Sequence, residues 1–354
     1  MSTVSPPATV AAAAATRKLG VGLVGTGRIG RLHADVIDRQ VDGLLLTSVF
    51  DPVREAAEEV ASAHGSTVAP DDLSLIQDPQ VDVVAICSST DTHAQLIVEA
   101  AAAGKAIFCE KPVSLDLAEV DRALAAVTRA GVPFMVGFNR RFDAAHGSVE
   151  AAVRDGKIGE VHLLRISSRD PAPPPIEYVR VSGGIFLDMM IHDFDMARFV
   201  TGSEVVEVFA RGAVRIDPAI GDAGDVDTAV VTLTHANGCI TAIDNSRQAV
   251  YGFDQRVEAF GSLGVSSSLN PPAHTGVTIT AEGISGPPLP WFFLDRYVPT
   301  YVNEWRAFLQ ALTAGGPSPV GVRDARMPLA IGLAAGRSLA EGRPVRVEEI
   351  EAGS

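Results

Sequence analysis

The sequence predicts two domains of different class: a doubly wound α/β domain with a parallel sheet, then an α+β domain with a large, mostly antiparallel, open-faced sheet. In the first part of the chain, short β-branched runs alternate with helical patterns, which is typical of βαβ units. In the second part, long β-rich stretches carry hairpin signals. The length of 354 residues is also typical of two domains.

The α/β pattern predicts a first domain over residues 18–138, preceded by a disordered tail at residues 1–17 that is rich in Ala, Ser, Thr and Pro. Strands are expected at 19–24, 44–50, 81–87, 105–109 and 133–136. Helices are expected at 29–39, 52–64, 93–103 and 117–130.

The pattern changes after Asn139, so the second domain is expected over residues 139–354. Its β-rich stretches are 160–169, 204–216, 228–244, 255–269 and 276–282. Two of these stretches contain hairpin signals, at Asn237-Gly238 and at Gly261 to Gly264. Helices are expected at 144–155, 185–201, 297–314 and 323–341.

Composition excludes several classes of partner. The net charge of -14 repels nucleic acid and anionic lipid, so neither is expected to bind. No apolar run reaches the roughly 18 residues of a membrane span. The N-terminal alanines lack a preceding basic region, so no secretory signal is expected either. We therefore expect a small-molecule substrate.

The three cysteines, Cys87, Cys109 and Cys239, are widely spaced. Their odd number and spacing fit neither a disulfide framework nor a zinc site. Cys87 and Cys109 lie in apolar runs and are interpreted as buried core thiols. The chain is therefore expected in a reducing compartment, the cytoplasm.

A glycine-rich segment directly follows the first predicted strand. Its residues are Gly25, Thr26, Gly27, Arg28, Ile29 and Gly30, which fit G-x-G-x-x-G. Between a strand and a helix, this pattern allows a tight turn and brings backbone and helix N-terminus close to a pyrophosphate. The segment predicts a Rossmann dinucleotide site, with a plain glycine-rich turn as the alternative.

Asp51 ends the second predicted strand, about 20 residues past the third glycine. An acidic residue at this place binds the adenosine ribose and repels a 2′-phosphate, which favours NAD over NADP. The alternative is an aspartate that forms a turn before Pro52. Arg54 lies nearby and would soften the preference for NAD.

Polar residues follow the third and fourth predicted strands, at the carboxyl edge of the sheet where ligands bind. The cofactor-contacting candidates there are Ser88, Ser89, Thr90, His93, Glu110 and Lys111. Asp91 or Thr92 is alternatively a helix cap. Lys111 stands before Pro112 and is expected to stabilise an alkoxide in the cleft between the domains, with a plain surface lysine as the alternative.

The predicted helix at 185–201 is apolar apart from a few charged residues. Asp188, His192 and Asp195 have spacings of i, i+4 and i+7, which place them on one helical face. Buried polar groups of this kind are costly unless they are paired or used. Asp193 is expected to face solvent or a loop. Two or three ligands do not complete a metal site, so no metal is expected.

Together, the glycine segment, Glu110-Lys111-Pro112 and Gly183 to Asp195 resemble the glucose-fructose oxidoreductase/inositol dehydrogenase family. The resemblance covers nearly the whole chain after Lys18 and is strongest to inositol 2-dehydrogenases. Four further stretches carry it: Gly137 to Asp143, Ser168 to Pro171, Tyr251 to Asp254 and Phe292 to Tyr297.

The resemblance implies a role for individual residues. Lys111 is similar to the family's active-site lysine, and Asp188 and His192 to its catalytic pair. Asn139 and Arg140 resemble positions that line the nicotinamide and substrate pocket, and Tyr251 falls in a segment that reaches the substrate. Family members commonly have a cis bond before the proline at Pro112, and they assemble as homotetramers through the open sheet face.

The activity implied is NAD-dependent oxidation of a ring hydroxyl of myo-inositol, with hydride passing to NAD and the proton to His192. The same motifs serve another cyclitol, an aldose or a glycoside, so the substrate stays open among these. A non-catalytic regulator that senses dinucleotide is the alternative from another class. Such a regulator is expected to have lost the Lys–Asp–His set, which this chain retains.

Overall fold

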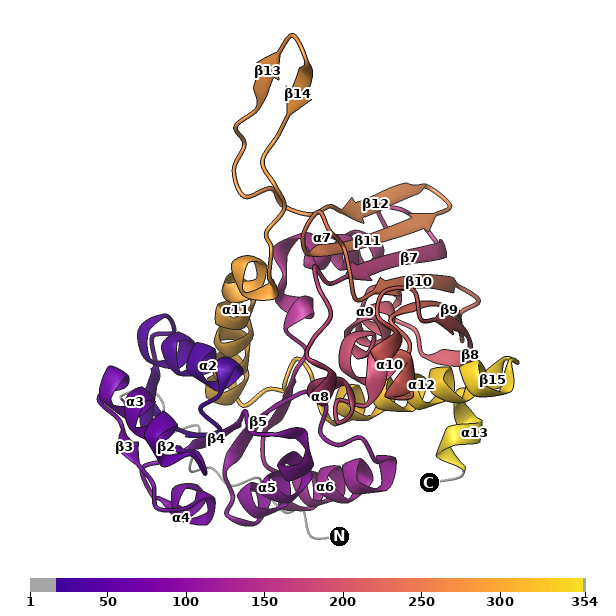
Figure 1. Ribbon diagram of the computed structural model, residues 1–354. Coiled ribbons are helices and arrows are strands. Elements are labelled where there is room, and N and C mark those ends of the chain that lie inside the picture. The colour runs from indigo at the N-terminus through magenta and orange to yellow at the C-terminus, as the bar shows by residue number, and fades with distance from the viewer. Residues whose placement is uncertain (1–16, 353–354) are drawn as a thin grey trace. The chain divides into compact units, whose positions relative to one another are not determined.

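The computed structural model describes residues 17–352, so the predicted disordered tail lies outside the described residues except for Arg17. The chain forms two compact units (Figure 1). The first unit contains the chain up to Asn139 and the later segment Thr300–Arg326. The second contains Arg140–Pro299 and the chain from Met327 onward. No helix within residues 17–352 has the length and hydrophobicity of a membrane span.

The first unit contains a parallel sheet, and the predicted doubly wound fold is confirmed. Its described strands are β1 (Leu19–Val24), β2 (Leu44–Phe50), β3 (Thr67–Val68), β4 (Val83–Ile86), β5 (Ala106–Glu110) and β6 (Phe134–Gly137). Their order is β3-β2-β1-β4-β5-β6, and every pair is parallel. The chain reverses its direction of winding between β1 and β4, which is where such sheets bind ligands.

Helices connect these strands much as the sequence predicts. They are α2 (Arg28–Arg39), α3 (Arg54–His64), α4 (Asp72–Gln77), α5 (Thr90–Ala102) and α6 (Leu117–Ala130). Helix α4 was not predicted because its six residues are too few for a clear period, although the Asp71 side chain caps it by accepting from Ser74 N. Helix α5 begins at Thr90 with Ser89 as N-cap, so the prediction that Asp91 or Thr92 caps it is wrong.

The core of the first unit is completed by residues far away in sequence. Helix α11 (Phe293–Ala314) contributes Trp305, whose ring stacks on Phe108 of β5 with centroids 4.6 Å apart. Beyond the helix, Val136 N of β6 donates to Val320 O at 3.1 Å. Cys87 and Cys109 are buried in this core as predicted, and burial raises the pKa of both thiols.

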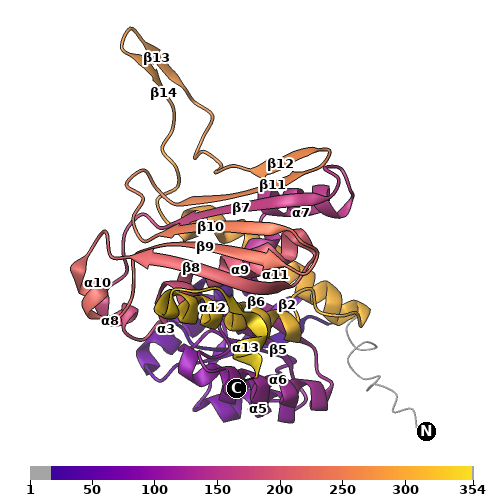
Figure 2. The ribbon, with the colours of Figure 1, turned by 90° about the vertical axis from the view of Figure 1, so that its right-hand side faces the viewer.

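The second unit is built on a mixed sheet. Its strands are β7 (Val161–Arg169), β8 (Val205–Ala213), β9 (Thr228–His235), β10 (Ile240–Ser246), β11 (Asp254–Gly261), β12 (Gly264–Ser268) and β15 (Val345–Arg346). In the described chain their order is β12-β11-β7-β10-β9-β8-β15 (Figure 2). Every pair is antiparallel except β7 with β10, which confirms the mostly antiparallel prediction. Both predicted hairpins form.

One face of this sheet packs against helices α7 (Ala144–Arg154) and α9 (Ile191–Thr201). The other face carries a row of apolar side chains at paired positions. Val265, Phe260, Leu163 and Ile240 are successive cross-strand neighbours. Phe260 and Ile240 are each 49% exposed. The predicted open face is therefore present and partly apolar.

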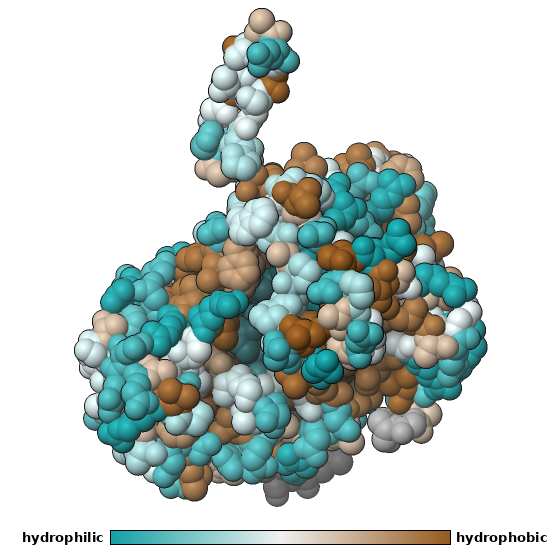
Figure 3. Space-filling view, in the orientation of Figure 1, coloured by the Kyte–Doolittle hydropathy of each residue, from teal (hydrophilic) through white to brown (hydrophobic). Residues whose placement is uncertain are grey.

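Strand β13 (Thr278–Thr280) lies within the predicted β-rich stretch 276–282. Four other short elements of the second unit were not predicted: α8 (Ile176–Val179), α10 (Pro218–Asp222), β14 (Gly283–Ser285) and α13 (Val347–Glu351). Strands β13 and β14 form a hairpin that projects from the rest of the unit (Figure 1). Its residues Ile279 and Ile284 are exposed. Figure 3 shows hydrophobic atoms among more polar ones on this projecting segment.

Helix α12 (Val322–Glu341) is joined to β8 by one buried hydroxyl. Ser338 Oγ accepts from Ala210 N at 3.0 Å and donates to Arg343 O at 2.6 Å. We predict that Ser338→Ala lowers the free energy of unfolding by about 1–3 kcal/mol, because a buried amide and a carbonyl lose their partner. Denaturant titration tests this value. A variant as stable as the parent would contradict it, and exposed Ser262→Ala is the control.

Candidate active site

The glycine segment between β1 and α2 has the shape that a dinucleotide requires. Gly25 has φ +95°, and a Cβ there would lie 2.5 Å from Ser88 N. A Cβ on Gly30 would lie 2.0 Å from Gly25 O, so both positions need glycine. A Cβ on Gly27 would meet no described atom within 4 Å. The side of the turn at Gly27 is therefore open to a ligand, while its other side is closely packed.

The N-terminus of α2 follows directly. Its N-cap residue is Gly27, and in the described structure no side chain caps it. Its first turn holds no acidic residue. Amide groups without a side-chain cap and the positive end of the helix dipole therefore suit a phosphate group. These features fit the pyrophosphate of the predicted dinucleotide.

Asp51 at the end of β2 contacts the glycine segment through its side chain. Its Oδ2 accepts from Thr26 N at 2.7 Å and from Thr26 Oγ1 at 3.0 Å, and its Oδ1 accepts from Val53 N at 2.9 Å. The Thr26 side chain is buried, so its role is to hold the turn. Asp51 therefore lies beside the glycine segment and is held there by backbone amides on both of its oxygens.

His93 of α5 joins the two polar loops after β4 and β5. Its Nδ1 lies 2.8 Å from Pro112 O, and its Nε2 lies 3.0 Å from Ser88 O. Burial lowers the pKa of this imidazole. The side chain is 2% exposed, so it has little surface for the predicted contact with a cofactor. The structure instead shows His93 bracing the backbone of both loops.

Lys111 follows β5, and its bond to Pro112 is cis, as the family resemblance implied. The preceding Glu110 is buried, and its Oε1 lies 2.8 Å from His33 Nε2. Trp305 Nε1 donates to His33 Nδ1 at 2.8 Å, so His33 donates to Glu110 through Nε2. This chain of contacts fixes the end of β5 from which Lys111 extends.

Glu304 is a buried acid that the sequence analysis missed. It is 0% exposed, and within residues 17–352 neither of its carboxyl oxygens has a hydrogen-bond partner. Burial, followed by the charge of Glu110, raises the pKa of Glu304 well above its usual value. Burial therefore favours the protonated, neutral form of the Glu304 carboxyl. Its place in α11 gave no signal, because the return of this helix to the first unit depends on long-range packing.

The segment that carries Asp188 is not the continuous α-helix that was predicted. Residues Ile185–Met189 form a π-helical turn, closed by Met190 N donating to Ile185 O at 2.8 Å, and α9 begins at Ile191. The two preceding glycines have positive φ, +85° at Gly183 and +76° at Gly184. Ideal i, i+4 spacing therefore does not describe the path from Asp188 to His192. π-turns of this kind are frequent at functional sites.

Both carboxylate oxygens of Asp188 receive hydrogen bonds within the second unit. Tyr178 Oη donates to Oδ1 at 2.8 Å, and Arg247 Nη1 donates to Oδ2 at 3.3 Å. Arg247 is 1% exposed. Neither partner was predicted from sequence: Tyr178 lies in α8, whose four residues give no clear helical period, and Arg247 is 59 residues away from Asp188.

The prediction that Asp193 faces solvent or a loop is wrong. Asp193 is fully buried and accepts from Arg140 Nη1 and from Asn245 Nδ2, each at 2.8 Å. Burial raises the pKa of Asp193 to about 6, although these two partners oppose the shift. Asp195, which was grouped with Asp188 and His192, accepts from Arg141 Nε at 2.8 Å. These aspartates of α9 thus anchor the two arginines that follow Asn139.

The predicted substrate residues lie in different surroundings. Arg140 is buried and also donates to Ser168 Oγ at 3.1 Å. Asn139 is buried in the first unit, with its Nδ2 donating to Thr300 Oγ1 at 3.1 Å. Tyr251 is 50% exposed, and its hydroxyl donates to Asp254 at 2.7 Å. Arg140 is thus buried among charged and polar groups of the second unit, whereas Tyr251 is held at the surface of that unit.

Asp170, which directly follows β7, was not assigned a role from the sequence, but it interacts with several charged residues of the second unit. Burial raises its pKa to about 6. The positive charges of Arg140 and Arg247 act against this shift, and the negative charges of Asp188 and Asp193 add to it. These five charged groups therefore form one electrostatic cluster in the second unit.

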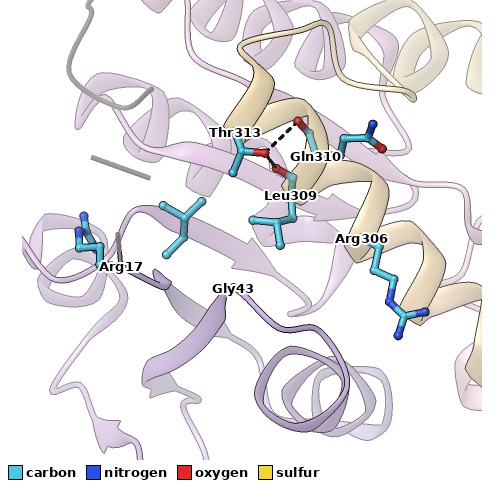
Figure 4. A pocket seen from close by; sticks show the side chains of 7 residues that line it. Arg17, Gly43, Arg306, Leu309, Gln310 and Thr313 are labelled. Carbon is cyan, nitrogen blue, oxygen red and sulfur yellow. Dashed lines mark hydrogen bonds between the residues drawn. The ribbon is translucent and has the colours of Figure 1, made fainter. Parts of the chain in front are cut away.

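A separate pocket of about 300 Å³ in the first unit is not part of this site (Figure 4). Its lining includes Leu19, the first residue of β1, and Gly43, which precedes β2. It therefore lies at the amino ends of the strands, whereas ligands of such sheets bind at the carboxyl ends.

The raised pKa of Asp170 predicts how stability depends on pH. The pKa of an aspartate in the unfolded chain is about 3.9. The contribution of Asp170 to the free energy of unfolding is therefore most favourable below about pH 4 and is lost as pH rises through about 6. We predict that Asp170→Asn raises the free energy of unfolding by about 1–2 kcal/mol at about pH 8, with no gain below about pH 4. Urea titrations at both pH values measure this. A pH-independent change would count against it, and exposed Asp222→Asn is the matched control.

Comparison with known proteins places this geometry in a family. Residues 19–138 match the oxidoreductase family model with an NAD-binding Rossmann fold, and residues 146–266 match the GFO/IDH/MocA C-terminal domain. The chain is 48% identical to a myo-inositol 2-dehydrogenase of Thermotoga maritima, over 93% of this chain and 99% of that protein. It is 46% identical to an inositol 2-dehydrogenase of Rhizobium meliloti, over 92% and 98%.

Solved structures give the same result. A scyllo-inositol dehydrogenase of Lactobacillus casei, determined with NAD(H) and scyllo-inositol, is 28% identical and superposes with a TM-score of 0.88, over 94% of this chain and 100% of that one. The glycine segment, the cis bond after Lys111 and the two-unit architecture accord with these matches. The chain belongs to the GFO/IDH/MocA family of oxidoreductases, with an NAD-binding Rossmann domain.

Proposed function

We propose that the protein oxidises a ring hydroxyl of myo-inositol to the keto-inositol, with NAD as oxidant. The observation that carries this proposal is nearly full-length identity of 46–48% to proteins named inositol 2-dehydrogenases. The chain also has lysine, aspartate and histidine at all three catalytic positions that the resemblance implies, Lys111, Asp188 and His192. This retention speaks against a non-catalytic sensor.

The proposed cofactor site is the carboxyl edge of the parallel sheet. Bound NAD supplies the acceptor for hydride. We propose that Gly25 to Gly30 hold the pyrophosphate and that Asp51 binds the ribose, which favours NAD over NADP. The remaining proposed contacts come from the loops after β4 and β5: Ser88, Ser89, Thr90, Glu110 and Lys111, with His93 acting through the backbone it braces.

In the proposed mechanism, three side chains take part in removing the proton of the substrate hydroxyl. Lys111 polarises the substrate hydroxyl and stabilises the developing alkoxide. His192 takes the hydroxyl proton as general base. Asp188 orients His192 and stabilises its charged form. Asp188 is suited to this because hydrogen bonds to both of its oxygens hold it in place.

The charged cluster of the second unit suits an uncharged, hydroxyl-rich substrate. Inositol needs many hydrogen-bonding groups, and we propose that Asn139, Arg140 and Tyr251 join the catalytic residues in supplying them. A second candidate is the scyllo isomer, because the chain is also 36% identical to a scyllo-inositol 2-dehydrogenase of Bacillus subtilis. Either substrate would place the protein in polyol catabolism.

We further propose a cytoplasmic homotetramer. The support is the apolar row on the open face of the second sheet, because an exposed apolar surface of this kind needs covering. Three buried thiols without a disulfide accord with a reducing compartment.

The substrate proposal predicts NADH formation with myo-inositol and weaker turnover with glucose, followed by the absorbance of NADH. His192→Ala should reduce turnover by roughly two to four orders of magnitude, because the general base is lost. Its affinity for NAD should stay within a few-fold of the parent, since the glycine segment is intact. Activity on aldoses with none on any inositol isomer would overturn the proposal.

The glycine segment provides a test of the cofactor site. Gly27→Ala should leave stability nearly unchanged, because a Cβ there meets no described atom within 4 Å. It should weaken NAD binding at least tenfold, which is a loss of about 1.4 kcal/mol or more of binding free energy. The reason is that the methyl group occupies the space in which a phosphate group would approach the backbone. Gly30→Ala is the comparison and should destabilise the fold itself, with its Cβ 2.0 Å from Gly25 O. Calorimetry of NAD binding and thermal melts distinguish the two, and normal NAD affinity in Gly27→Ala would rule out this placement.

A further inference from the structure

Arg247 occupies an unusual place for a cation. It follows β10, is 1% exposed, and its guanidinium lies between two aspartates. Nη1 donates to Asp188 Oδ2 at 3.3 Å, and Nη2 donates to Asp225 Oδ2 at 3.4 Å. Arg247 N also donates to Asp227 O at 2.9 Å, which fixes the backbone from which the side chain extends. The bridge therefore joins a catalytic candidate to a carboxylate outside the family motifs.

Asp225 connects this bridge to the start of the π-turn. Its Oδ1 accepts from Ile185 N at 3.0 Å, the first residue of the turn that carries Asp188. A Cβ on Gly184 would lie 2.7 Å from the same oxygen, so the approach of Asp225 depends on glycine there. Arg247 thus contacts the turn twice, at Asp188 directly and at Ile185 through Asp225.

The remaining oxygen of Asp188 is held by Tyr178, which is 47% exposed. Tyr178 provides a neutral hydrogen bond, whereas Arg247 provides a buried positive charge. In a poorly solvated setting, a cation within hydrogen-bond distance favours the ionised carboxylate and offsets its field at neighbouring groups. The two partners of Asp188 therefore have different electrostatic effects.

We propose that Arg247 is a positioning residue for the oxidation reaction, which anchors Asp188 to Asp225 and opposes the negative charge that Asp188 presents to His192. This inference rests on the proposed function, in which Asp188 orients the base. With Arg247 in place, the carboxylate that the proposed mechanism sets beside His192 is paired with a cation rather than bare. Its imidazole can then lose its proton at a lower pH and act as base near neutrality.

Other charged groups of the second unit belong in the test, and Asp170 interacts electrostatically with both Asp188 and Arg247. Asp170 after β7 and Asp193 of α9 are negative, and both titrate at about 6 because of burial. Arg140 is positive and paired with Asp193. Arg247 lowers the pKa of Asp170, so its removal also changes the titration of Asp170, and that contribution must be separated from that of His192.

The test is the pH dependence of kcat/KM for inositol oxidation. In Arg247→Met, the acidic limb should move to higher pH by about one unit, with most activity restored at high pH. Arg247→Lys retains the cation and should recover most of the shift. Asp225→Asn should move the acidic limb to lower pH, because the positive charge of Arg247 then has one negative neighbour fewer. Arg165→Met removes an exposed arginine bonded to Glu258 and is the matched control, with no shift expected.

A direct measurement separates this inference from the proposed function. NMR titration of labelled histidine rings in the protein without substrate reports the pKa of His192, identified among the eight histidines by His192→Gln. It should rise in Arg247→Met and fall in Asp225→Asn, and the rise should persist in an Asp170→Asn background. If Arg247→Met does not fold, Arg247→Lys and Asp225→Asn still test the direction of the shift in the pKa of His192. If neither the pKa of His192 nor the pH profile of kcat/KM changes in these variants, the proposed role of Arg247 is overturned. If the wild-type protein is inactive on every inositol, the proposed function is overturned instead.

Discussion

Pairing of buried charge is the constraint on which the second unit depends. Arg140 with Asp193 is a buried ion pair, and the buried Arg247 pairs with Asp188, whose side chain is 14% exposed. Removing one member of such a pair leaves a buried charge uncompensated, which is strongly destabilising. The pairs therefore fix the start of η1 (Asn139–Phe142), the π-turn and α9 with respect to the sheet. Polar residues suited to a hydroxyl-rich substrate are thus held by the same contacts that hold the unit together.

The first unit meets a different constraint, the close approach of backbone to ligand. Gly25 and Gly30 are packed against neighbouring backbone, whereas Gly27 is open. Nearby, the contacts from Trp305 through His33 to Glu110 fix the strand end before Lys111. Rigid backbone on one side of the turn and open space on the other suit phosphate recognition by amide groups and a helix dipole.

Sequence reasoning found what short-range patterns encode. The parallel sheet, the glycine segment and both hairpins follow from strand periodicity and turn residues, and the structure confirms them. Arg247 and Glu304 were not predicted, because their surroundings arise from contacts between segments distant in sequence. Tyr178 was not predicted, because the four residues of α8 give no clear helical period. Asp193 was placed wrongly because an aspartate is normally solvated, and a single sequence does not show that Arg140 pairs with it. The π-turn was missed because it replaces a regular helical period after two glycines.

The central claim is that this chain moves a hydride from a ring carbon of inositol to NAD. The most direct measurement uses myo-inositol deuterated at the carbon that bears the oxidised hydroxyl, incubated with enzyme and NAD in ordinary water. Mass spectrometry of the nicotinamide product should find one deuterium per reduced cofactor, together with a keto-inositol. Reduced cofactor without deuterium, or no reduction with any inositol isomer, would contradict the account.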